Sequence, residues 1–592
     1  MTQMTFPGGS RVLRPAAVTF ARALAAALPV GAFFVWSFIV AMPAAAQETV
    51  FDLGALPVDE GFAISNDTGD FLSRMDIGGA VGDINGDGFE DFAWGGTDDD
   101  AGRPIYVVFG RGGAFPALLA VSTLDGSNGF VVSDDGARLA EATSVERAGD
   151  VNGDGFDDFA VGAHRLGGGA VDSVGFVVYG RATFPASVDY LDLDTGFGFF
   201  IGDSATWPSG PSRQVFIREA GDVNGDGRDD LFVGLPDADS EPADPSLNPG
   251  AAYLIYGRSS DFPGVLDLDD LDGSNGFTMP PVPESDDANR QDFARSGGYV
   301  GDLNGDGRDD FAVGRPFARG QESDGGIGIG AVDVVYGRDT NFPASLDLAS
   351  LAPSEGFSVI AASPPDDVGD LGWSLTDLGD FDGDGVGDLL IGSPLSNPPG
   401  LADTGSGSAF IVYGAADGAD VIAGTGGGAR VTALIPVEFP TLGAGDSLPN
   451  AAAVGIDVAG GDVNGDGLDD AVLGNGGSTS ADGRAAAGVS YVVFGRTGRP
   501  ATLDLFSLAA FGGYRIIGSA GDFAGRSIDA ADVAGADGRS EVLIAGEGFH
   551  DVPDGSLVGA VQVVLGGAEP GLFADGFESG DTLAWFATVG GV

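Results

Sequence analysis

The stretch "GDVNGDGRDDLFVG" at residues 221–234 decides the fold, because it crowds acidic residues and glycine in front of an abruptly apolar run. Short runs rich in Val, Leu and Phe and bounded by glycine are typical of β-strands. When such a stretch recurs along a chain, the repeat indicates the architecture of the whole fold. Six clear copies occupy residues 82–95, 149–162, 221–234, 301–314, 379–392 and 461–474, and a seventh, altered copy occupies residues 531–546.

The sequence around each copy repeats as well. Each acidic loop is followed by a β-rich run that ends in an aromatic residue and glycine or an equivalent, such as "AYLIYGR" (252–258), and several of these runs lead into a signature such as "FPGVLDLDDLDGSNGFTM" (262–279). With a short apolar run before each loop, this pattern predicts about four strands per unit and seven units. Four short strands cannot bury their own faces, so neighbouring units have to cover them. The sequence therefore predicts an all-β fold, a seven-bladed β-propeller, with an open solenoid as the alternative.

The two ends of the repeat region predict how the ring closes. The segment "TVFDLGALPVDEGFAIS" (49–65) matches the third signature but follows no acidic loop, whereas the last unit stops after "VQVVLGG" (561–567) and lacks that signature. We expect the N-terminal segment to supply the missing outer strand of the last blade, which hides the two open sheet edges. The predicted propeller spans residues 47–567.

The acidic loop has the pattern of a cation site. Numbered from its first Asp, it carries oxygen-bearing side chains at positions 1, 3, 5 and 9, and a glycine at position 6 that allows a sharp turn. With the backbone carbonyl of position 7, about six hard oxygen ligands converge, which suits Ca²⁺ better than Mg²⁺. Position 12 is apolar in all six copies, which excludes helix-flanked loops that need a carboxylate there. Position 8, Asp229 in the quoted copy, points away from the ion in this scheme and receives no role.

These loops lie at 83–91, 150–158, 222–230, 302–310, 380–388 and 462–470, and we expect them to hold about six structural calcium ions. The predicted ligands are Asp83, Asn85, Asp87, Phe89, Asp91, Asp150, Asn152, Asp154, Phe156, Asp158, Asp222, Asn224, Asp226, Arg228, Asp230, Asp302, Asn304, Asp306, Arg308, Asp310, Asp380, Asp382, Asp384, Val386, Asp388, Asp462, Asn464, Asp466, Leu468 and Asp470. The seventh loop, 532–541, departs from the pattern. Aligning Asp537-Gly538 to positions 5 and 6 puts Glu541 at position 9 and leaves Asp532 one residue out of register, so no seventh ion is expected.

Residues outside the loops add to a resemblance with a known family. The loops are followed by Gly234-Leu235-Pro236, Gly314-Arg315-Pro316 and Gly392-Ser393-Pro394, and Phe293-Ala294 precedes one of them. Together these motifs resemble the FG-GAP repeats of the integrin alpha-subunit propeller and of bacterial exported relatives. The departures are Gly162-Ala163-His164, with His in place of Pro, and a Phe-Gly element that is poorly kept. The resemblance covers roughly residues 49–567, and it implies a seven-bladed propeller with Ca²⁺ in the hairpin loops between inner strands.

Composition limits the partners and indicates export. The formal net charge is −61, every basic residue is Arg, and Cys is absent, which argues against nucleic-acid binding and against disulfides or thiolate metal sites. Residues 1–46 have the pattern of a signal peptide: three Arg residues, the apolar run Ala23–Met42, and small residues before Gln47. An uncleaved anchor is the alternative. We interpret the tail, 568–592, as a sorting or attachment signal, or else as an unstructured end.

The sequence thus predicts an exported calcium-binding propeller that serves as a binding or adhesion module. Its expected location is secreted, periplasmic or at the cell surface, with a protein or glycan ligand outside the cell, no membrane span after signal removal, and a monomeric ring. The alternative is a polysaccharide-acting lyase or hydrolase that uses a propeller face, since carboxylate pairs are abundant. However, the loops already account for most clustered Asp residues, so no catalytic residue is predicted.

Overall fold

The computed structural model describes residues 49–566 except for gaps, most of them in loops. The gaps are 54–55, 57–59, 66–77, 96–103, 134–141, 164–172, 203–213, 237, 239–249, 283–291, 319–329, 361–369, 395, 397–406, 416–421, 424–428, 431–434, 439–453, 479–485, 500–502, 506–507, 509–511, 520, 536–537 and 547–559. The predicted signal peptide (1–46) and tail (568–592) lie outside the described residues.

Seven sheets, here called blades 1 to 7, each contain four antiparallel strands, and the prediction of an all-β seven-bladed propeller is confirmed. From the inside outward, the strands of blades 1 to 4 are β3 (Gly78–Gly82), β4 (Asp91–Gly95), β5 (Ile105–Val108) and β7 (Gly129–Ser133); β8 (Ala142–Gly149), β9 (Asp158–Ala163), β10 (Ser173–Val178) and β12 (Gly198–Gly202); β13 (Phe216–Gly221), β14 (Asp230–Leu235), β15 (Ala251–Ile255) and β17 (Gly276–Met279); β18 (Gly297–Tyr299), β19 (Phe311–Arg315), β20 (Ala331–Val335) and β21 (Gly356–Ile360). Those of blades 5 to 7 are β22 (Leu375–Gly379), β23 (Asp388–Ser393), β24 (Ser408–Val412) and β27 (Ile435–Glu438); β28 (Val458–Gly461), β29 (Asp470–Leu473), β30 (Val489–Val493) and β32 (Gly513–Ile517); β33 (Ser527–Ala531), β34 (Glu541–Gly546), β35 (Ala560–Val564) and β2 (Gly61–Ser65).

The core consists of apolar layers between blades. One layer, for example, joins Val107 and Phe130 of blade 1 to Phe159 and Phe176 of blade 2, and a matching layer joins blade 7 to blade 1. The second strand of each blade is therefore covered on both faces, and every residue of β4, β9 and β14 is buried. Strands buried on both faces have continuous apolar sequences, which explains why the run after each loop does not alternate.

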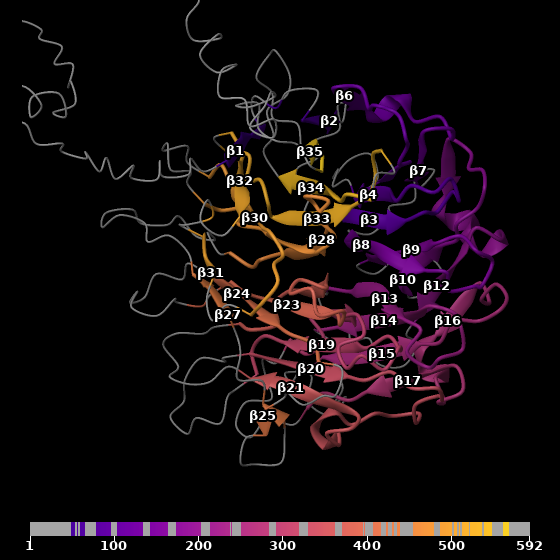
Figure 1. Cartoon of the computed structure of the whole chain (residues 1–592). Helices are drawn as coiled ribbons and strands as arrows, with labels where there is room; N and C mark the ends of the chain where they lie inside the picture. The colour runs from indigo at the N-terminus through magenta and orange to yellow at the C-terminus, as the bar shows by residue number, and fades with distance from the viewer. Residues whose placement is uncertain are drawn as a thin grey trace, which may run out of the picture. The chain divides into compact units, whose positions relative to one another are not determined.

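The N-terminal segment closes the ring, as the sequence predicts. β2 pairs antiparallel with β35, so that Ala63 lies opposite Gln562 and β2 is the fourth strand of blade 7. The inner strands contact one another in the order β3, β8, β13, β18, β22, β28 and β33, and β33 contacts β3 again. In Figure 1 the last blade, in yellow, accordingly lies beside the first, in indigo.

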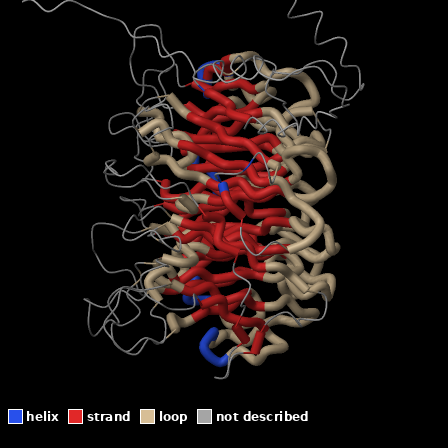
Figure 2. Tube along the Cα trace, turned by 60° about the vertical axis from the view of Figure 1, so that its left-hand side comes forward, coloured by secondary structure: helices blue, strands red, loops and turns tan. Residues whose placement is uncertain are grey.

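Short outer strands link neighbouring blades beyond the four-strand pattern. Five blades have a parallel fifth strand. In four of them this strand comes from the segment after the third strand of the next blade, and in blade 6 it comes from the N-terminal segment. These strands are β6 (Leu118–Ala120) on β2, β11 (Ser187–Asp189) on β7, β16 (Val265–Asp267) on β12, β31 (Leu503–Asp504) on β27 and β1 (Thr49–Asp52) on β32. The 3-10 turns are η2 (Val121–Thr123), η3 (Tyr190–Thr195), η4 (Leu268–Asp270) and η5 (Leu348–Ser350), and β25 (Ile422–Ala423) pairs with β26 (Ala429–Arg430). Figure 2 shows the strands in the middle and the loops along both sides.

Candidate metal centres

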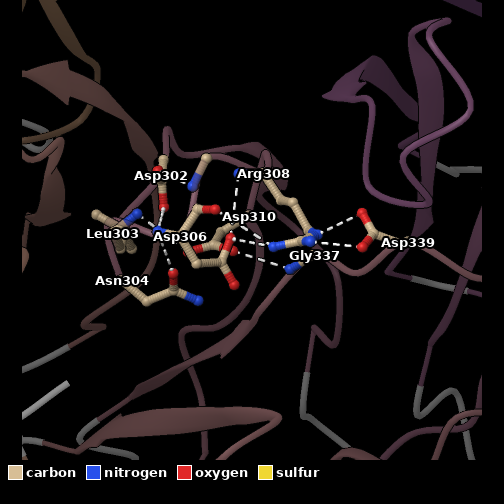
Figure 3. A network of polar contacts seen from close by, with 9 residues as sticks. Asp302, Leu303, Asn304, Asp306, Arg308, Asp310, Gly337 and Asp339 are labelled. Carbon is tan, nitrogen blue, oxygen red and sulfur yellow. Dashed lines mark hydrogen bonds and ion pairs between the residues drawn. The ribbon is translucent and has the colours of Figure 1, made fainter. Parts of the chain in front are cut away.

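Each acidic loop joins the first strand of a blade to the second, where the family resemblance implies a metal site. The loop of blade 4 is drawn in Figure 3, between β18 and β19. The side chain of Asp302 at position 1 accepts hydrogen bonds from the backbone N–H groups of Asp306 (3.0 Å) and Gly307 (2.7 Å). These bonds curl the backbone around the carboxylate, and Gly307 has the positive φ of 84° that the sharp turn requires.

The side chains at positions 3 and 5 hold the rest of the turn. Asn304 Oδ1 accepts from the N–H of Asp306 (2.9 Å), and Asp306 Oδ1 accepts from the N–H of Arg308 at position 7 (3.1 Å). The position-1 bonds recur in all six loops, from the N–H groups of positions 5 and 6 to Asp83, Asp150, Asp222, Asp302, Asp380 and Asp462. The six copies thus share the position-1 turn, while the bond from the N–H of position 5 to the side chain of position 3 is present in blades 2 to 5.

The carboxylate at position 9 is the most buried part of the loop. Asp310 is 0% exposed, and its two oxygens accept from the N–H groups of Leu303 (3.0 Å) and Gly337 (2.8 Å). Burial raises the pKa of Asp310 to about 8, and the carboxylates of Asp302 and Asp306 raise it further, while the backbone donors lower it. Burial likewise raises the pKa of Asp91 to about 9 and that of Asp388 to about 8. Near neutral pH, a carboxylate in this setting is ionised mainly when a positive charge lies close by.

The loops can therefore offer a cation several converging oxygens. In blade 5, Asp380, Asp382 and Asp384 each place one carboxylate oxygen within 4.8 Å of the others. In the other five loops position 3 is an Asn, so that an amide joins the carboxylates of positions 1 and 5. Carboxylate and amide oxygens in this number fit Ca²⁺. The predicted carbonyl ligands at position 7, such as Arg308, lie in the same turn, and their role in metal binding stays a prediction.

Position 8, to which sequence analysis assigned no role, connects neighbouring blades. Asp229 Oδ2 accepts the N–H of Asp150, the first residue of the preceding blade's loop, at 2.7 Å. The equivalent bonds join Asp157 to Asp83 (2.9 Å), Asp309 to Asp222 (2.8 Å), Asp469 to Asp380 (2.8 Å) and Glu90 to Asp532 (3.0 Å). We call these five contacts the interblade latches. Each latch ties the start of one loop to the end of the next.

The latch explains the glycine in front of the loop. A Cβ at Gly149 would lie 2.4 Å from Asp229 Oδ2, and its φ is +71°. The two junctions without a latch carry different residues at position 8, Gly387 and Ser540. At the first of these, Asp377 of β22 takes the space, since its Oδ1 lies 2.7 Å from the position of a Cβ on Gly301.

The seventh loop keeps more of the pattern than its sequence predicts. Asp532 Oδ2 accepts the N–H of Gly538 (3.2 Å), which is the bond that position 1 makes to position 6 in the other loops. Glu541, 2% exposed, accepts from Val533 and Ala534 (both 2.9 Å), in the manner of position 9. Asp532 thus makes the position-1 bond to Gly538 although one additional residue separates the two, and the absence of a seventh ion stays a prediction. Asp537 lies outside the described residues.

The fold and these loops define a class: a β-propeller with an acidic turn between the inner strands of its blades. The family model described as FG-GAP repeat matches residues 295–332 and 372–412, which include the loops of blades 4 and 5. The chain therefore contains FG-GAP repeats at these residues and is similar in sequence to integrin alpha subunits.

Relatives support this assignment over part of the chain. Integrin alpha pat-2 of Caenorhabditis briggsae is 27% identical over 44% of this chain and 17% of its own length. Phosphatidylinositol-glycan-specific phospholipase D of Rattus norvegicus is 31% identical over 34% of this chain and 21% of its own length. The chain thus spans about a fifth of the curated relatives it matches.

A solved structure is also similar. The BP39L lectin from Burkholderia pseudomallei aligns with a TM-score of 0.40 and 12% identity, over 84% of this chain and 98% of that chain. Within the described part of the chain, we find no helical segment with the length and apolarity that a bilayer crossing requires.

Proposed function

We propose that the protein is an exported propeller that binds calcium in the loops of blades 1 to 6 and serves as a binding or adhesion module. One observation carries the calcium part: six loops with the same position-1 turn bury a position-9 carboxylate completely beside two further acidic side chains. A divalent cation would neutralise these groups and hold the turn, so its role is structural. Export is inferred from residues 1–46, and the monomeric ring from the closure between β2 and β35.

Metal analysis and thermal unfolding test the calcium proposal. We expect about six Ca²⁺ ions per chain after dialysis, a sharply lower Tm in chelator, and recovery with Ca²⁺ but not with equimolar Mg²⁺. Each site adds RT ln(1 + [Ca²⁺]/Kd), about 1.4 kcal/mol at tenfold excess over Kd. Six such sites are comparable to the total stability of a domain.

A single variant sharpens this test. Asp226→Ala removes the position-5 carboxylate of one loop, so it should lower the bound calcium by one ion per chain and leave the other loops loaded. Protein without bound metal, and with the same Tm before and after chelation, would contradict the calcium proposal.

The binding role rests on the class of fold and on the relatives, and the ligand is proposed only by class, as a protein or glycan outside the cell. Glycan and protein arrays, probed with and without Ca²⁺, should show retention of a ligand that depends on calcium. Release of a cleaved glycan product would instead favour the polysaccharide-acting enzyme. Because the aligned regions are about a fifth of the relatives, the activity in the name phospholipase D is not proposed for this chain.

A further inference from the structure

The acidic loop of blade 5 differs from the other five in two places at once. Position 3 is Asp382 where the others have Asn. The segment that packs over this loop also differs: Arg499-Pro500 stands where the equivalent segments have Phe-Pro, at Phe115, Phe184, Phe262 and Phe342. In those segments the Phe ring packs on the preceding blade, as Phe262 stacks on Phe199 with the centroids 4.3 Å apart. A carboxylate and a guanidinium have therefore replaced an amide and a ring at neighbouring sites.

The two changed residues contact each other inside the candidate metal centre. Arg499 Nε donates to Asp382 Oδ2 at 2.5 Å, and Arg499 Nη2 donates to Asp384 Oδ2 at 2.6 Å and to the carbonyl of Gly414 at 3.0 Å. Asp382 is only 5% exposed. The guanidinium thus bridges positions 3 and 5, two of the three carboxylates that converge in this loop.

Two arginines in other loops make a different contact. Arg228 and Arg308 belong to their own loops, at position 7, and within the loop each pairs with the position-5 carboxylate, with Nη1 to Oδ1 distances of 3.0 and 3.3 Å. Arg308 also pairs with Asp339, outside the loop, at 2.6 Å. Position 3 in both loops is a neutral Asn. Among the described loops, bridging by an arginine from another blade occurs in blade 5.

The backbone that carries Arg499 lacks a bond that holds its equivalents. Tyr179 Oη accepts the N–H of Phe262 and Tyr256 Oη accepts the N–H of Phe342, both at 2.6 Å. The corresponding hydroxyl, Tyr413 Oη, is buried and has no hydrogen-bond partner in the described structure. The Arg499 side chain contacts the acidic loop itself and the Tyr413 ring, whose centroid lies 4.9 Å away.

We propose that Arg499 is a built-in competitor of calcium at the loop of blade 5. The inference rests on the proposed function, because it concerns the same kind of site. The ion and the guanidinium need the same oxygens of Asp382 and Asp384, and an arginine cannot lose its charge to make way. Calcium therefore enters only when the guanidinium leaves, which makes this loop a weak site that responds to calcium concentration, whereas the other five are filled first.

Displacement of Arg499 should affect the outer edge of blade 5, where β31 pairs with β27. Four residues after Arg499 begins β31, whose Leu503 pairs with Val437 of β27. Release of the guanidinium removes a contact four residues before this short strand. Calcium at this loop should thus loosen the β27–β31 pair while it rigidifies the loop.

Calcium titration of the metal-stripped full chain by calorimetry tests the proposal. We expect five sites of similar affinity and a sixth at least tenfold weaker in the wild type. Arg499→Phe, the residue of the equivalent segments, should move the sixth site into the strong class. Arg499→Lys keeps the charge but cannot bridge two carboxylates in the same plane. It should therefore raise the calcium affinity of the sixth site a few-fold above that of the wild type. Arg258→Gln removes an arginine from an equivalent segment and should leave all sites unchanged.

Hydrogen exchange of residues 503–504 and 435–438 provides the second readout, and should rise in the wild type only when the sixth site fills. Six equal sites in the wild type, or identical titrations for the wild type and both Arg499 variants, would overturn the competitor and leave the calcium proposal standing. Absence of calcium binding in every variant would instead mean that the proposed function itself fails.

Discussion

A carboxylate at position 8 links neighbouring blades at five junctions of the described ring. The Asp229 side chain lies between two loops and accepts a backbone N–H of the preceding blade. Burial raises its pKa, and the Arg147 guanidinium and the Asp150 N–H lower it. Because the bond has a charged acceptor and is partly buried, it should contribute more than an ordinary surface hydrogen bond.

At this scale we predict that Asp229→Ala lowers the free energy of unfolding by about 1–3 kcal/mol, since it leaves the Asp150 N–H without an acceptor. Asp229→Asn keeps an oxygen in place and should cost less. Denaturant unfolding in saturating Ca²⁺ measures both, and metal analysis should return the same number of ions as in the wild type. Loss of one ion in Asp229→Ala would show that position 8 belongs to the metal centre instead.

At the scale of the element, the N-terminal segment acts as a clasp over two blades. β1 lies against β32 of blade 6, and β2 then completes blade 7 beside β35. Phe51, Leu53, Phe62 and Ile64 are each at most 4% exposed. Burial of such side chains contributes about 1.5–3 kcal/mol each, so that their sum approaches the stability of a whole domain.

We therefore predict that a chain without residues 47–65 fails to close. It should leave the edge of β35 open, unfold at a much lower temperature and associate through that edge. A peptide of residues 47–65 added in trans should restore the Tm and the monomeric elution volume by adding the missing strand, whereas a scrambled peptide should not. A truncated chain that stays monomeric with an unchanged Tm would contradict the role of the clasp.

Sequence alone predicted the strands and the loops, because local composition sets them. It also predicted the clasp, because residues 49–65 carry the outer-strand signature without a preceding acidic loop. It did not reveal the latches, because their two partners lie in different blades. In the four latches between consecutive repeats, the partners are 74 to 89 residues apart. The bond between Asp532 and Gly538 was not evident from sequence for a related reason: it spans one residue more than the fixed spacing of the other loops. The Arg499 bridge had a signal in sequence, the paired departures from Asn and Phe, but only the packing of blade 6 over blade 5 shows that they meet.

At the scale of the whole molecule, charges from distant blades interact around the inner strands. Arg147 of blade 2 pairs with Glu90 (3.3 Å), Asp157 (3.4 Å) and Glu219 (3.0 Å). Arg218 of blade 3 pairs with Glu146 (2.9 Å) and feels the carboxylates of Asp457 and Asp529, from blades 6 and 7. Acidic groups outnumber these two arginines, so some carboxylates retain a proton near neutral pH.

This arrangement predicts how the stability of the metal-free protein depends on pH. Burial raises the pKa of Glu219, Asp457 and Asp529 to about 7 in each case, above the usual values of about 4 in an unfolded chain. The folded state then binds more protons than the unfolded state between pH 4 and 7. The contribution of these three carboxyl groups to the free energy of unfolding is complete below about pH 4 and is lost as the pH rises through 7.

In chelator, the Tm should therefore fall as the pH is raised from about 5.5 to 8. The double variant Asp457→Asn, Asp529→Asn should flatten this dependence without abolishing it, because Glu219 and the position-9 carboxylates still titrate. A Tm that rises with pH over this range would show that the ionised forms are the ones stabilised by folding.

Closure of the ring also requires blade 1 to wait until blade 7 has been synthesised. The contact between the Ala80 N–H and Asp529 Oδ2 joins blade 1 to blade 7 across 449 residues of chain. At about 5–20 residues per second during synthesis, the first blade waits roughly 20 to 90 seconds for this partner. During that time one side of blade 1 is uncovered and strand β2 lacks its antiparallel partner β35, so the nascent chain is most vulnerable to misassembly and proteolysis before its last blade emerges.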